Sequence, residues 1–418
     1  MSAQVFPSPS AADTRTQRNA TDTINWIPAA VAFAMACAGA LLIPRSTVPF
    51  VWGALSLTAA CVGAERITRQ TWGRALWVNL VVLCLTLAAA ETYFWAREPI
   101  ERQMQYSEGF FLYDETLGYK PAAGQVLSHQ TNVQDELLYQ VEYTINQDGL
   151  RAAMPANAVR TEGETCLVFF GDSFTFGEGM PDRQTMPAQV WKKLHGTLPV
   201  VNFGFLGYGP HQMLAALQDG RLESQGHCHP NHVVYQAIPS HVSRAAGLES
   251  WDPNGPRYVL DDTARVRRSG HFVEAPAQSV LDWYRRWYQH VSWQIRKALE
   301  QSVLHRRILH SHRTVGQHDV ALFTGIVVEA KTLVERTYPG AQFHVLFWDF
   351  KDDLPIAGQV LQQLREHNVT VHPMSTILPN FPADEQRYEI SPDDRHPNAI
   401  AHEIIADFVA QSLLQKIR

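Results

Sequence analysis

The chain has 418 residues, of which 45% are hydrophobic and 18% are charged, and its formal net charge is −6. This length is too great for one ordinary core, so two or more parts are expected. The acidic balance argues against broad nucleic-acid binding, and no nucleic acid is expected as a partner.

Three apolar runs without charged residues stand in the N-terminal quarter, and we interpret each as a transmembrane helix. The runs are Trp26 to Ile43, Val48 to Ala64 and Ala75 to Ala90. Spanning a bilayer takes about 20 residues, and the third run reaches that length through an aromatic end at Trp95 that suits the membrane interface. A cleaved signal peptide fits the first run poorly, because two more spans follow it at once. Residues 1–105 are therefore predicted to form a membrane anchor.

Arginine residues set the predicted orientation of this anchor. Five of them lie before the first run or between the second and the third, at positions 15, 18, 66, 69 and 74, whereas only Arg45 lies in the short first hairpin. Positively charged loops tend to stay in the cytoplasm. The sequence thus predicts a multi-pass protein of the inner (cytoplasmic) membrane, with everything after about Ala96 in the extracytoplasmic, periplasmic space.

The rest of the chain is predicted to hold a small β-rich extension and then an α/β domain. Residues 106–160 are polar, with turn signals and short alternating runs. From residue 161 to 418 strands alternate with helices, which favours a parallel sheet covered by helices on both faces. Strands are expected at 166–170, 198–203, 232–237, 343–349 and 369–373, and helices at about 185–195, 210–224, 317–337, 355–367 and 397–416.

Cysteine placement is compatible with an oxidising compartment. Cys166 and Cys228 are the two cysteines outside the apolar runs, and each stands near the start of a predicted strand. If those strands are parallel neighbours the two can pair, and two buried thiols are the alternative.

A basic and aromatic stretch from about 278 to 312 is predicted to form a long helix. Trp283, Trp287, Val291, Ile295 and Leu299 recur every four residues along it. This pattern is typical either of a helix packed on the domain with a solvated basic face, or of a helix that lies against an anionic membrane or forms a lid.

Two short motifs carry the predicted chemistry. Gly171-Asp172-Ser173 follows the first apolar strand, and a serine at a strand-to-helix turn needs a base to take its proton. Asp393 and His396 stand just before the last predicted helix, and a histidine oriented by a carboxylate is such a base. Gly-Asp-Ser alone is a common turn and an aspartate before a helix is often a cap. Their order and their placement beside the expected elements favour a serine esterase or an acyl-transfer enzyme.

These residues resemble the conserved blocks of the SGNH (GDSL-type) hydrolase superfamily, over roughly residues 161–418. The first block is similar to Gly171 through Gly179, and the last block, Asp-x-x-His, is similar to Asp393 and His396. The resemblance implies a flavodoxin-like three-layer α/β/α sandwich with a parallel sheet. It also implies that Ser173 is the nucleophile, that His396 is the base and that Asp393 orients the base.

The resemblance further implies an oxyanion hole built from the N–H of Ser173, the N–H of Gly207 and an asparagine side chain. The asparagine is missing, because Ser240 stands where it is expected. Loss of one oxyanion donor costs about 10²–10³ in kcat. The site is therefore slower with the Ser240 hydroxyl in place of the amide, or Gln236 or His241 completes it, or it is adapted to another acceptor, or the chain is an inactive binding relative.

The sequence predicts a membrane-anchored, extracytoplasmic serine esterase that acts on acyl esters, and in family terms on O-acetyl groups of a cell-surface glycan. One alternative is an O-acyltransferase that modifies a polysaccharide or lipid-linked glycan with the same triad. Another is a catalytically degraded glycan-binding or assembly module. Expected partners are an acylated glycan or lipid-linked substrate, the membrane and proteins of a polysaccharide pathway. No cofactor is expected, and no metal, because the histidines at 227, 229 and 232 lack a second cluster with ligand spacing.

Overall fold

The computed structural model describes residues 49–68, 70–97, 102–133, 135–158, 163–277, 280–310 and 314–413, together with Ala34. The chain forms two compact units. One unit consists of Met1–Glu98 and Val291–Ile308, and the other of Pro99–His290 and Leu309–Arg418. This division differs from the predicted one, because the β-rich extension at 106–160 and the α/β domain at 161–418 belong to the same unit.

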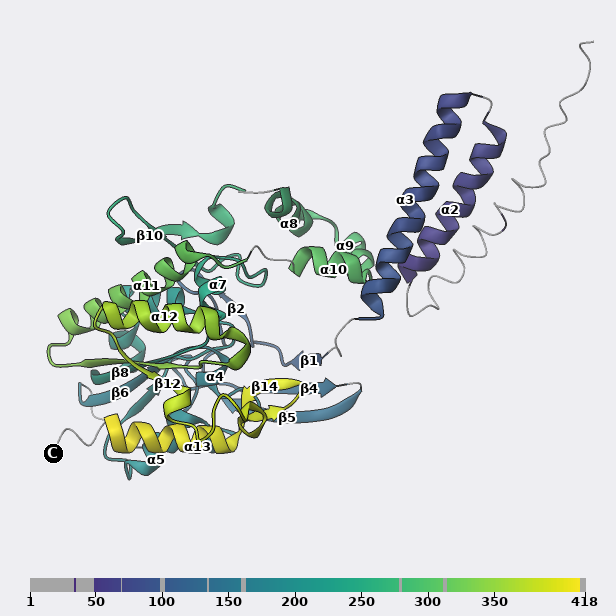
Figure 1. Ribbon diagram of the computed structural model, residues 1–418. Helices are drawn as coiled ribbons and strands as arrows, with labels where there is room; N and C mark the ends of the chain where they lie inside the picture. The colour runs from purple at the N-terminus through teal and green to yellow at the C-terminus, as the bar shows by residue number, and fades with distance from the viewer. Residues whose placement is uncertain are drawn as a thin grey trace, which may run out of the picture. The chain divides into compact units, whose positions relative to one another are not determined.

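The larger unit is built on a five-stranded parallel sheet (Figure 1). Its strands are β6 (Thr165–Phe170), β7 (Val200–Asn202), β8 (His229–Ala237), β11 (Gln342–Phe347) and β12 (Thr370–Pro373). They lie in the order β12-β11-β8-β6-β7. Numbered along the chain, this is the order 2-1-3-4-5 of the flavodoxin-like doubly wound fold. The predicted parallel sheet and its five strands are confirmed.

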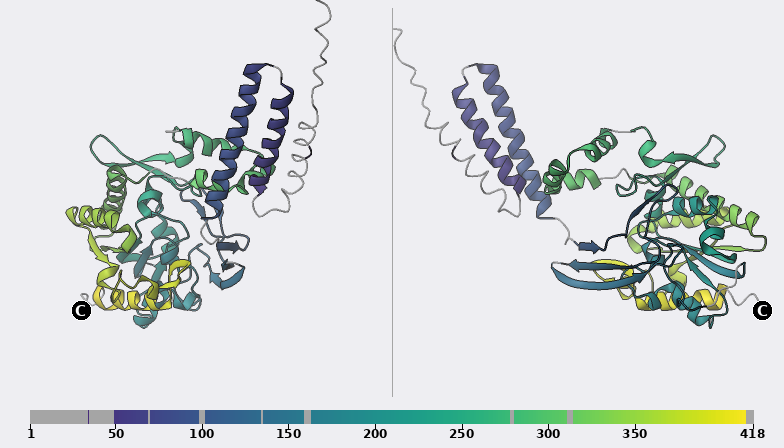
Figure 2. Two further views of the ribbon diagram at one scale, coloured as in Figure 1. Left: turned by 45° about the vertical axis from the view of Figure 1, so that its right-hand side comes forward. Right: turned by 180° about the vertical axis from the view of Figure 1, so that it is seen from behind.

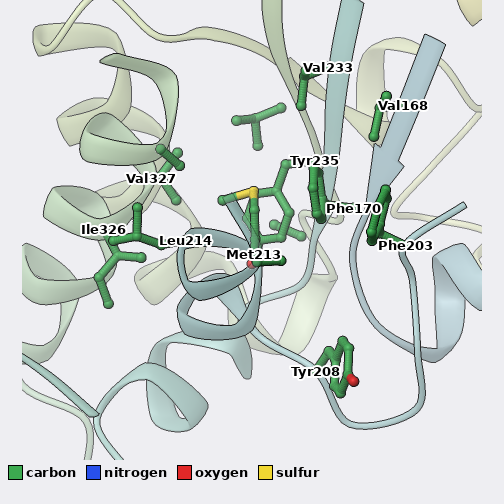
Figure 3. Packing of buried hydrophobic residues seen from close by; sticks show 14 of the residues in the cluster. Val168, Phe170, Phe203, Tyr208, Met213, Leu214, Val233, Tyr235, Ile326 and Val327 are labelled. Carbon is green, nitrogen blue, oxygen red and sulfur yellow. The ribbon is translucent and has the colours of Figure 1, made fainter. Parts of the chain in front are cut away.

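Helices cover both faces of this sheet, as predicted. The helices of one face are α6 (Pro210–Gln218), α11 (Gln317–Thr337) and α12 (Leu354–Glu366), and those of the other are α5 (Met186–Lys193) and α13 (Ala399–Phe408). Side chains of a strand point alternately to opposite faces. Val168 and Phe170 accordingly pack in the cluster that contains α6 and α11, which Figure 3 shows from close by, whereas Leu167 and Phe169 pack against α5 and α13.

The second predicted helix is shorter in the structure. The helix expected at 210–224 ends at Gln218, and Gly220 follows with a φ of +66°. A glycine in the left-handed region just after a helix is a common stop signal, because it carries no Cβ that opposes this conformation. The remaining elements of the unit are α4 (Ser173–Phe176), α7 (His241–Ala245), β9 (Pro256–Leu260), β10 (Val266–His271), α8 (Val280–His290), β13 (Glu389–Ser391) and β14 (Asp394–Pro397).

The region predicted as a β-rich extension contains short strands and shares its core with the sheet domain. Its strands are β1 (Arg102–Tyr106), β2 (Leu112–Asp114), β3 (Gly118–Lys120), β4 (Val126–Val133) and β5 (Glu136–Thr144). The strands β1, β4 and β5 form an antiparallel sheet, and β2 pairs with β3. Leu127 of β4 and Tyr143 of β5 are buried in the same hydrophobic cluster as Val168 of the parallel sheet. Because this apolar surface is buried on both sides, the extension is a structural part of the larger unit.

Cys166 and Cys228 form a disulfide, with a Cα–Cα distance of 5.9 Å. Cys166 is the second residue of β6, and Cys228 directly precedes β8, which pairs with β6 in parallel. Parallel neighbours begin at the same edge of a sheet, so the two thiols meet there. Of the two alternatives, the disulfide is therefore the one that the structure contains.

The smaller unit contains an apolar helical hairpin. It consists of α2 (Pro49–Ile67) and α3 (Thr71–Trp95), which lie side by side in both views of Figure 2. Among the described residues, α3 alone is long and apolar enough to cross a membrane, because the apolar part of α2 covers only Val51–Glu65. The first predicted span, Trp26 to Ile43, lies outside the described residues apart from Ala34. Within the described part of the chain, one helix of sufficient length thus stands where the second and third spans were predicted.

The long basic helix predicted at 278–312 is instead divided into α8, α9 (Trp293–Glu300) and α10 (Val303–His310). Ser302 begins α10 and accepts a hydrogen bond from the N–H of His305, and serine favours such caps over a helix interior. The carboxylate of Glu91 near the end of α3 accepts bonds from the hydroxyl of Ser302 and from the N–H groups of Val303 and Leu304. These N–H groups have no partner within their own helix, so Glu91 fixes the start of α10 on α3.

We expect the disulfide to stabilise the full chain in detergent. Replacing Cys166 and Cys228 together by alanine removes a cross-link between positions 62 residues apart, which should lower the free energy of unfolding by about 2–4 kcal/mol. Thermal unfolding followed by circular dichroism measures the shift. The matched control replaces the free cysteines Cys61 and Cys84. Equal midpoints for the Cys166/Cys228 variant and the wild type would contradict the assignment.

Candidate active site

Ser173 is the first residue of α4, and it follows the carboxyl end of β6. Gly171 makes the turn, with a φ of +155°, and a Cβ there would lie 2.1 Å from the hydroxyl oxygen of Thr175. Only glycine fits this close approach. Ser173 is buried, and its N–H belongs to the first turn of a helix, where backbone donors lack partners within the helix.

His396 of β14 lies within reach of Ser173, although 223 residues separate them. Its Nε2 is 2.8 Å from the Ser173 Oγ, and its Nδ1 is 2.5 Å from Oδ1 of Asp394. Phe174 packs against the imidazole, with ring centroids 5.3 Å apart. A hydroxyl, an imidazole and a carboxylate in this order form the hydrogen-bonded relay that activates a serine nucleophile.

The carboxylate of this relay belongs to Asp394, and the prediction of Asp393 was wrong. Asp393 is exposed, and its backbone N–H donates to the Ser391 hydroxyl. The reason is local structure, because Asp394 and His396 lie two residues apart on the strand β14 and therefore point to the same side. The expected Asp-x-x-His spacing fits a chain that is not extended, whereas residues 394–397 are extended in the structure.

Asp394 is held in its ionised form by its neighbours. The Nη1 of Arg102, from β1, lies 3.0 Å from the same Oδ1 that contacts His396. Burial alone would raise the pKa of Asp394, but His396 and Arg102 outweigh burial and lower it. Arg102 therefore joins the β-rich extension to the relay.

A second carboxylate, Glu178, lies at the other end of the imidazole. Its Oε2 is 3.1 Å from His396 Nε2, and the residue is buried. Burial would lower the pKa of His396, but the carboxylates of Glu178 and Asp394 raise it to about 10. The site therefore favours the doubly protonated imidazole at neutral pH.

Asp172 fixes the turn beneath the nucleophile. Its Oδ1 accepts from the Phe174 N–H, and its Oδ2 lies 2.9 Å from Arg244 Nη1 and 3.1 Å from His241 Nε2. Burial would raise the pKa of Asp172, but His241 and Arg244 outweigh it and hold it below the usual range. Arg244 also donates to the carbonyl of Tyr208, so one guanidinium connects the serine turn to the glycine-rich loop.

This geometry does not test the predicted oxyanion donors. Gly207 has a φ of +74°, and a Cβ there would lie 2.6 Å from the Tyr119 hydroxyl, so the loop requires glycine at this position. Ser240 is exposed at the start of α7, where its carbonyl accepts from the Ser243 hydroxyl. The donor roles of the Gly207 N–H and the Ser240 hydroxyl stay predictions.

The two residues considered as substitutes for the missing asparagine both contact the serine turn. Gln236 accepts a hydrogen bond from Thr175, and His241 contacts Tyr235 through Nδ1 and Asp172 through Nε2. Both side chains therefore support the serine turn.

The histidines near Cys228 do not form one cluster. His227 pairs with Asp148 at 2.9 Å, whereas His232 lies 3.3 Å from His344 on the neighbouring strand. Within the described ranges, no three His, Cys, Asp or Glu side chains are grouped to hold a metal ion.

Sequence reasoning missed three functional positions. Asp394 would have been found by interpreting 389–397 as a hairpin, since Pro392 and Asp393 separate two short alternating runs. Glu178 is five residues after Ser173, and only the turn at Gly177 brings it back to the site. Arg102 lies outside the region of family resemblance, and no sequence signal connected it to the relay.

No protein-family model and no curated protein matches this chain. Solved structures that are similar to this chain at low identity include two esterases. An acetyl xylan esterase (Est2A) from the rumen bacterium Butyrivibrio proteoclasticus is 13% identical, with a TM-score of 0.33 over 62% of this chain and 66% of that chain. A carbohydrate esterase, whose active site is described as having divergent catalytic and non-catalytic binding functions, is 12% identical, with a TM-score of 0.34 over 77% of this chain and 99% of that chain. Similarity at this level leaves the function to be argued from the geometry of the site.

We expect Asp394, and not Asp393, to be needed for the reactivity of Ser173. Asp394→Asn removes the charge that orients and stabilises the imidazole, and should slow labelling of Ser173 by a fluorophosphonate by up to about 10⁴-fold. Asp393→Asn changes an exposed carboxylate one residue away and should label at the wild-type rate. Mass spectrometry of the labelled peptide measures both rates. A large loss in the Asp393 variant alone would restore the original assignment.

Proposed function

We propose that this chain is a membrane-anchored serine esterase of the SGNH type that hydrolyses acyl esters outside the cytoplasm. The observation that carries the proposal is the 2.8 Å contact between Ser173 Oγ and His396 Nε2, with Asp394 at the opposite ring nitrogen. This arrangement stands at the carboxyl ends of the parallel strands, where doubly wound folds bind their ligands.

The reaction follows from this arrangement. Ser173 Oγ attacks the ester carbonyl carbon while its proton passes to His396 Nε2, and the carbonyl oxygen becomes an oxyanion. The intermediate collapses, the C–O bond to the alcohol breaks, and His396 returns the proton to the leaving alcohol. Water then attacks the acyl-enzyme by the same route and releases the carboxylic acid. The N–H groups of Ser173 and Gly207 are the proposed oxyanion donors, with Ser240 as a third.

The proposed location rests on α3 and on the charges near the apolar runs. The arginines at 15, 18, 66, 69 and 74 favour a cytoplasmic N-terminus, and an odd number of spans then carries the larger unit across the inner membrane. The disulfide supports this, because such bonds persist mainly in oxidising compartments such as the periplasm.

The proposed substrate is an O-acetylated cell-surface glycan, or a lipid-linked glycan, and proteins of a polysaccharide pathway are the proposed partners. The resemblance to anchored SGNH domains supports this class. An O-acyltransferase with the same residues is the second candidate, and the burial of Ser173 favours it because a shielded acyl-enzyme is protected from water until an acceptor hydroxyl arrives. The complete relay argues against a degraded binding module, whose main support was Ser240.

We expect the full chain in detergent to hydrolyse p-nitrophenyl acetate. Ser173→Ala and His396→Ala should each lower kcat/KM by at least about 10³-fold, and the double variant should lose little more, because the two residues act as a unit. Ser224→Ala, at an exposed serine of the larger unit, is the control. Spectrophotometry of p-nitrophenolate measures the rates. A fragment that begins at residue 161 is unsuitable, since it lacks Arg102. Activity that survives in the Ser173 variant would overturn the mechanism.

We expect the end of α3 to emerge on the extracytoplasmic side. Alkaline phosphatase fused after Arg97 should be active, because it folds only where its disulfides form, and a fluorescent protein fused at the same place should stay dark. A fusion before residue 15 should give the opposite pair of results. A bright fluorescent fusion with an inactive phosphatase after Arg97 would reverse the proposed topology.

A further inference from the structure

Glu178 is held beside the nucleophile by the backbone. The chain turns at Gly177, which has a φ of +82°, and the N–H of Glu178 then donates to the carbonyl of Ser173 at 2.9 Å. This turn directs the carboxylate to His396 Nε2, the same nitrogen that faces the Ser173 hydroxyl. Glu178 and Ser173 therefore share one partner atom.

The titratable groups around Glu178 and Ser173 come from four strands. They are Asp394 on β14, Arg102 and Tyr106 on β1, His129 on β4, and Tyr139 and Tyr143 on β5. Burial lowers the pKa of His129 and raises the pKa of the three tyrosines, so all four are neutral near pH 7. The charged groups left are Glu178, Asp394 and Arg102.

Two buried carboxylates and one guanidinium leave one negative charge without compensation. A buried charge of this kind is costly unless a counter-ion lies at hydrogen-bond distance. The imidazolium form of His396 provides it, since Nδ1–H faces Asp394 at 2.5 Å and Nε2–H faces Glu178 at 3.1 Å. Burial would raise the pKa of Glu178, but the His396 cation outweighs burial and lowers it.

We propose that Glu178 is a positioning residue that holds His396 doubly protonated in the resting site, so that Ser173 is activated only after the Nε2 proton has left. A solvent hydroxide ion takes this proton and becomes water, and the neutral imidazole then accepts the proton of Ser173 Oγ as the bond to the ester carbon forms. The inference rests on the proposed function, because it concerns the same serine and histidine. It adds that His396 acts as a base only at alkaline pH, or when Glu178 is neutralised.

The first test is the pH profile of kcat/KM for p-nitrophenyl acetate, measured on the full chain in detergent. Wild-type activity should rise through alkaline pH, since the base is His396 after loss of its second proton. Glu178→Gln removes the charge but keeps the shape of the side chain, and should move the midpoint down by about 1–3 pH units. Glu178→Asp keeps the charge and should restore part of the alkaline midpoint. Asp393→Asn, at an exposed carboxylate, is the matched control and should keep the wild-type profile.

The second test does not depend on activity. The chain is labelled with ¹³C at the histidine ring carbons, and the His396 signal is identified by its absence in His396→Gln. Its chemical shift, followed from pH 5 to 11, reports the protonation of the ring directly. The wild-type ring should be doubly protonated at pH 7, and Glu178→Gln should titrate at lower pH by the same shift as in the kinetic profile.

The outcomes separate the inference from the proposed function. A wild-type His396 that is neutral at pH 7, or a midpoint that Glu178→Gln leaves unchanged, overturns the role of Glu178. A chain that hydrolyses no ester and resists fluorophosphonate at every pH overturns the proposed function, while the ring titration still decides whether Glu178 controls His396. A merely structural role for Glu178 would lower activity at all pH values without moving either midpoint.

Discussion

The imidazole of His396 is the group on which the arrangement of the larger unit depends. It is nearly buried, and a carboxylate faces each of its two nitrogens. Charges in such a place persist only where partners are supplied in fixed positions. Asp394 comes from the same strand, Glu178 from the turn after the nucleophile, and Arg102 from a strand far upstream. The fold therefore brings three separate segments together around one imidazole.

The antiparallel sheet is part of this arrangement and not a spacer. Its strand β1 supplies Arg102, and on β5 the Tyr143 hydroxyl accepts the N–H of Gly179, next to Glu178. Arg151 lies over the Tyr143 ring and pairs with Asp182 on the far side of the same turn. These contacts fix the loop that carries Glu178, so changes in the extension can alter the surroundings of His396 from a distance.

In the smaller unit one buried carboxylate has a comparable role. Glu91 accepts three hydrogen bonds at the start of α10, more than 200 residues later in the chain. Its charge suits the positive end of a helix and satisfies donors that have no partner within that helix. An apolar segment thus carries an ionisable residue for a structural reason. Hydropathy alone would have interpreted Glu91 as the end of a span.

The sequence by itself determined the parallel sheet, its five strands and most of the helices that cover it, and it indicated the pair Ser173 and His396. These follow from local pattern, because buried parallel strands read as apolar runs and the Gly-Asp-Ser turn stands at the end of one. The disulfide was left open, since pairing depends on which strands are neighbours. Only the tertiary structure decided that Asp394 replaces Asp393, because the choice depends on whether 394–397 is extended. It alone also decided the placement of Arg102 and Glu178, since their partners are set by long-range packing and by one glycine turn, neither of which leaves a periodic signal in the chain.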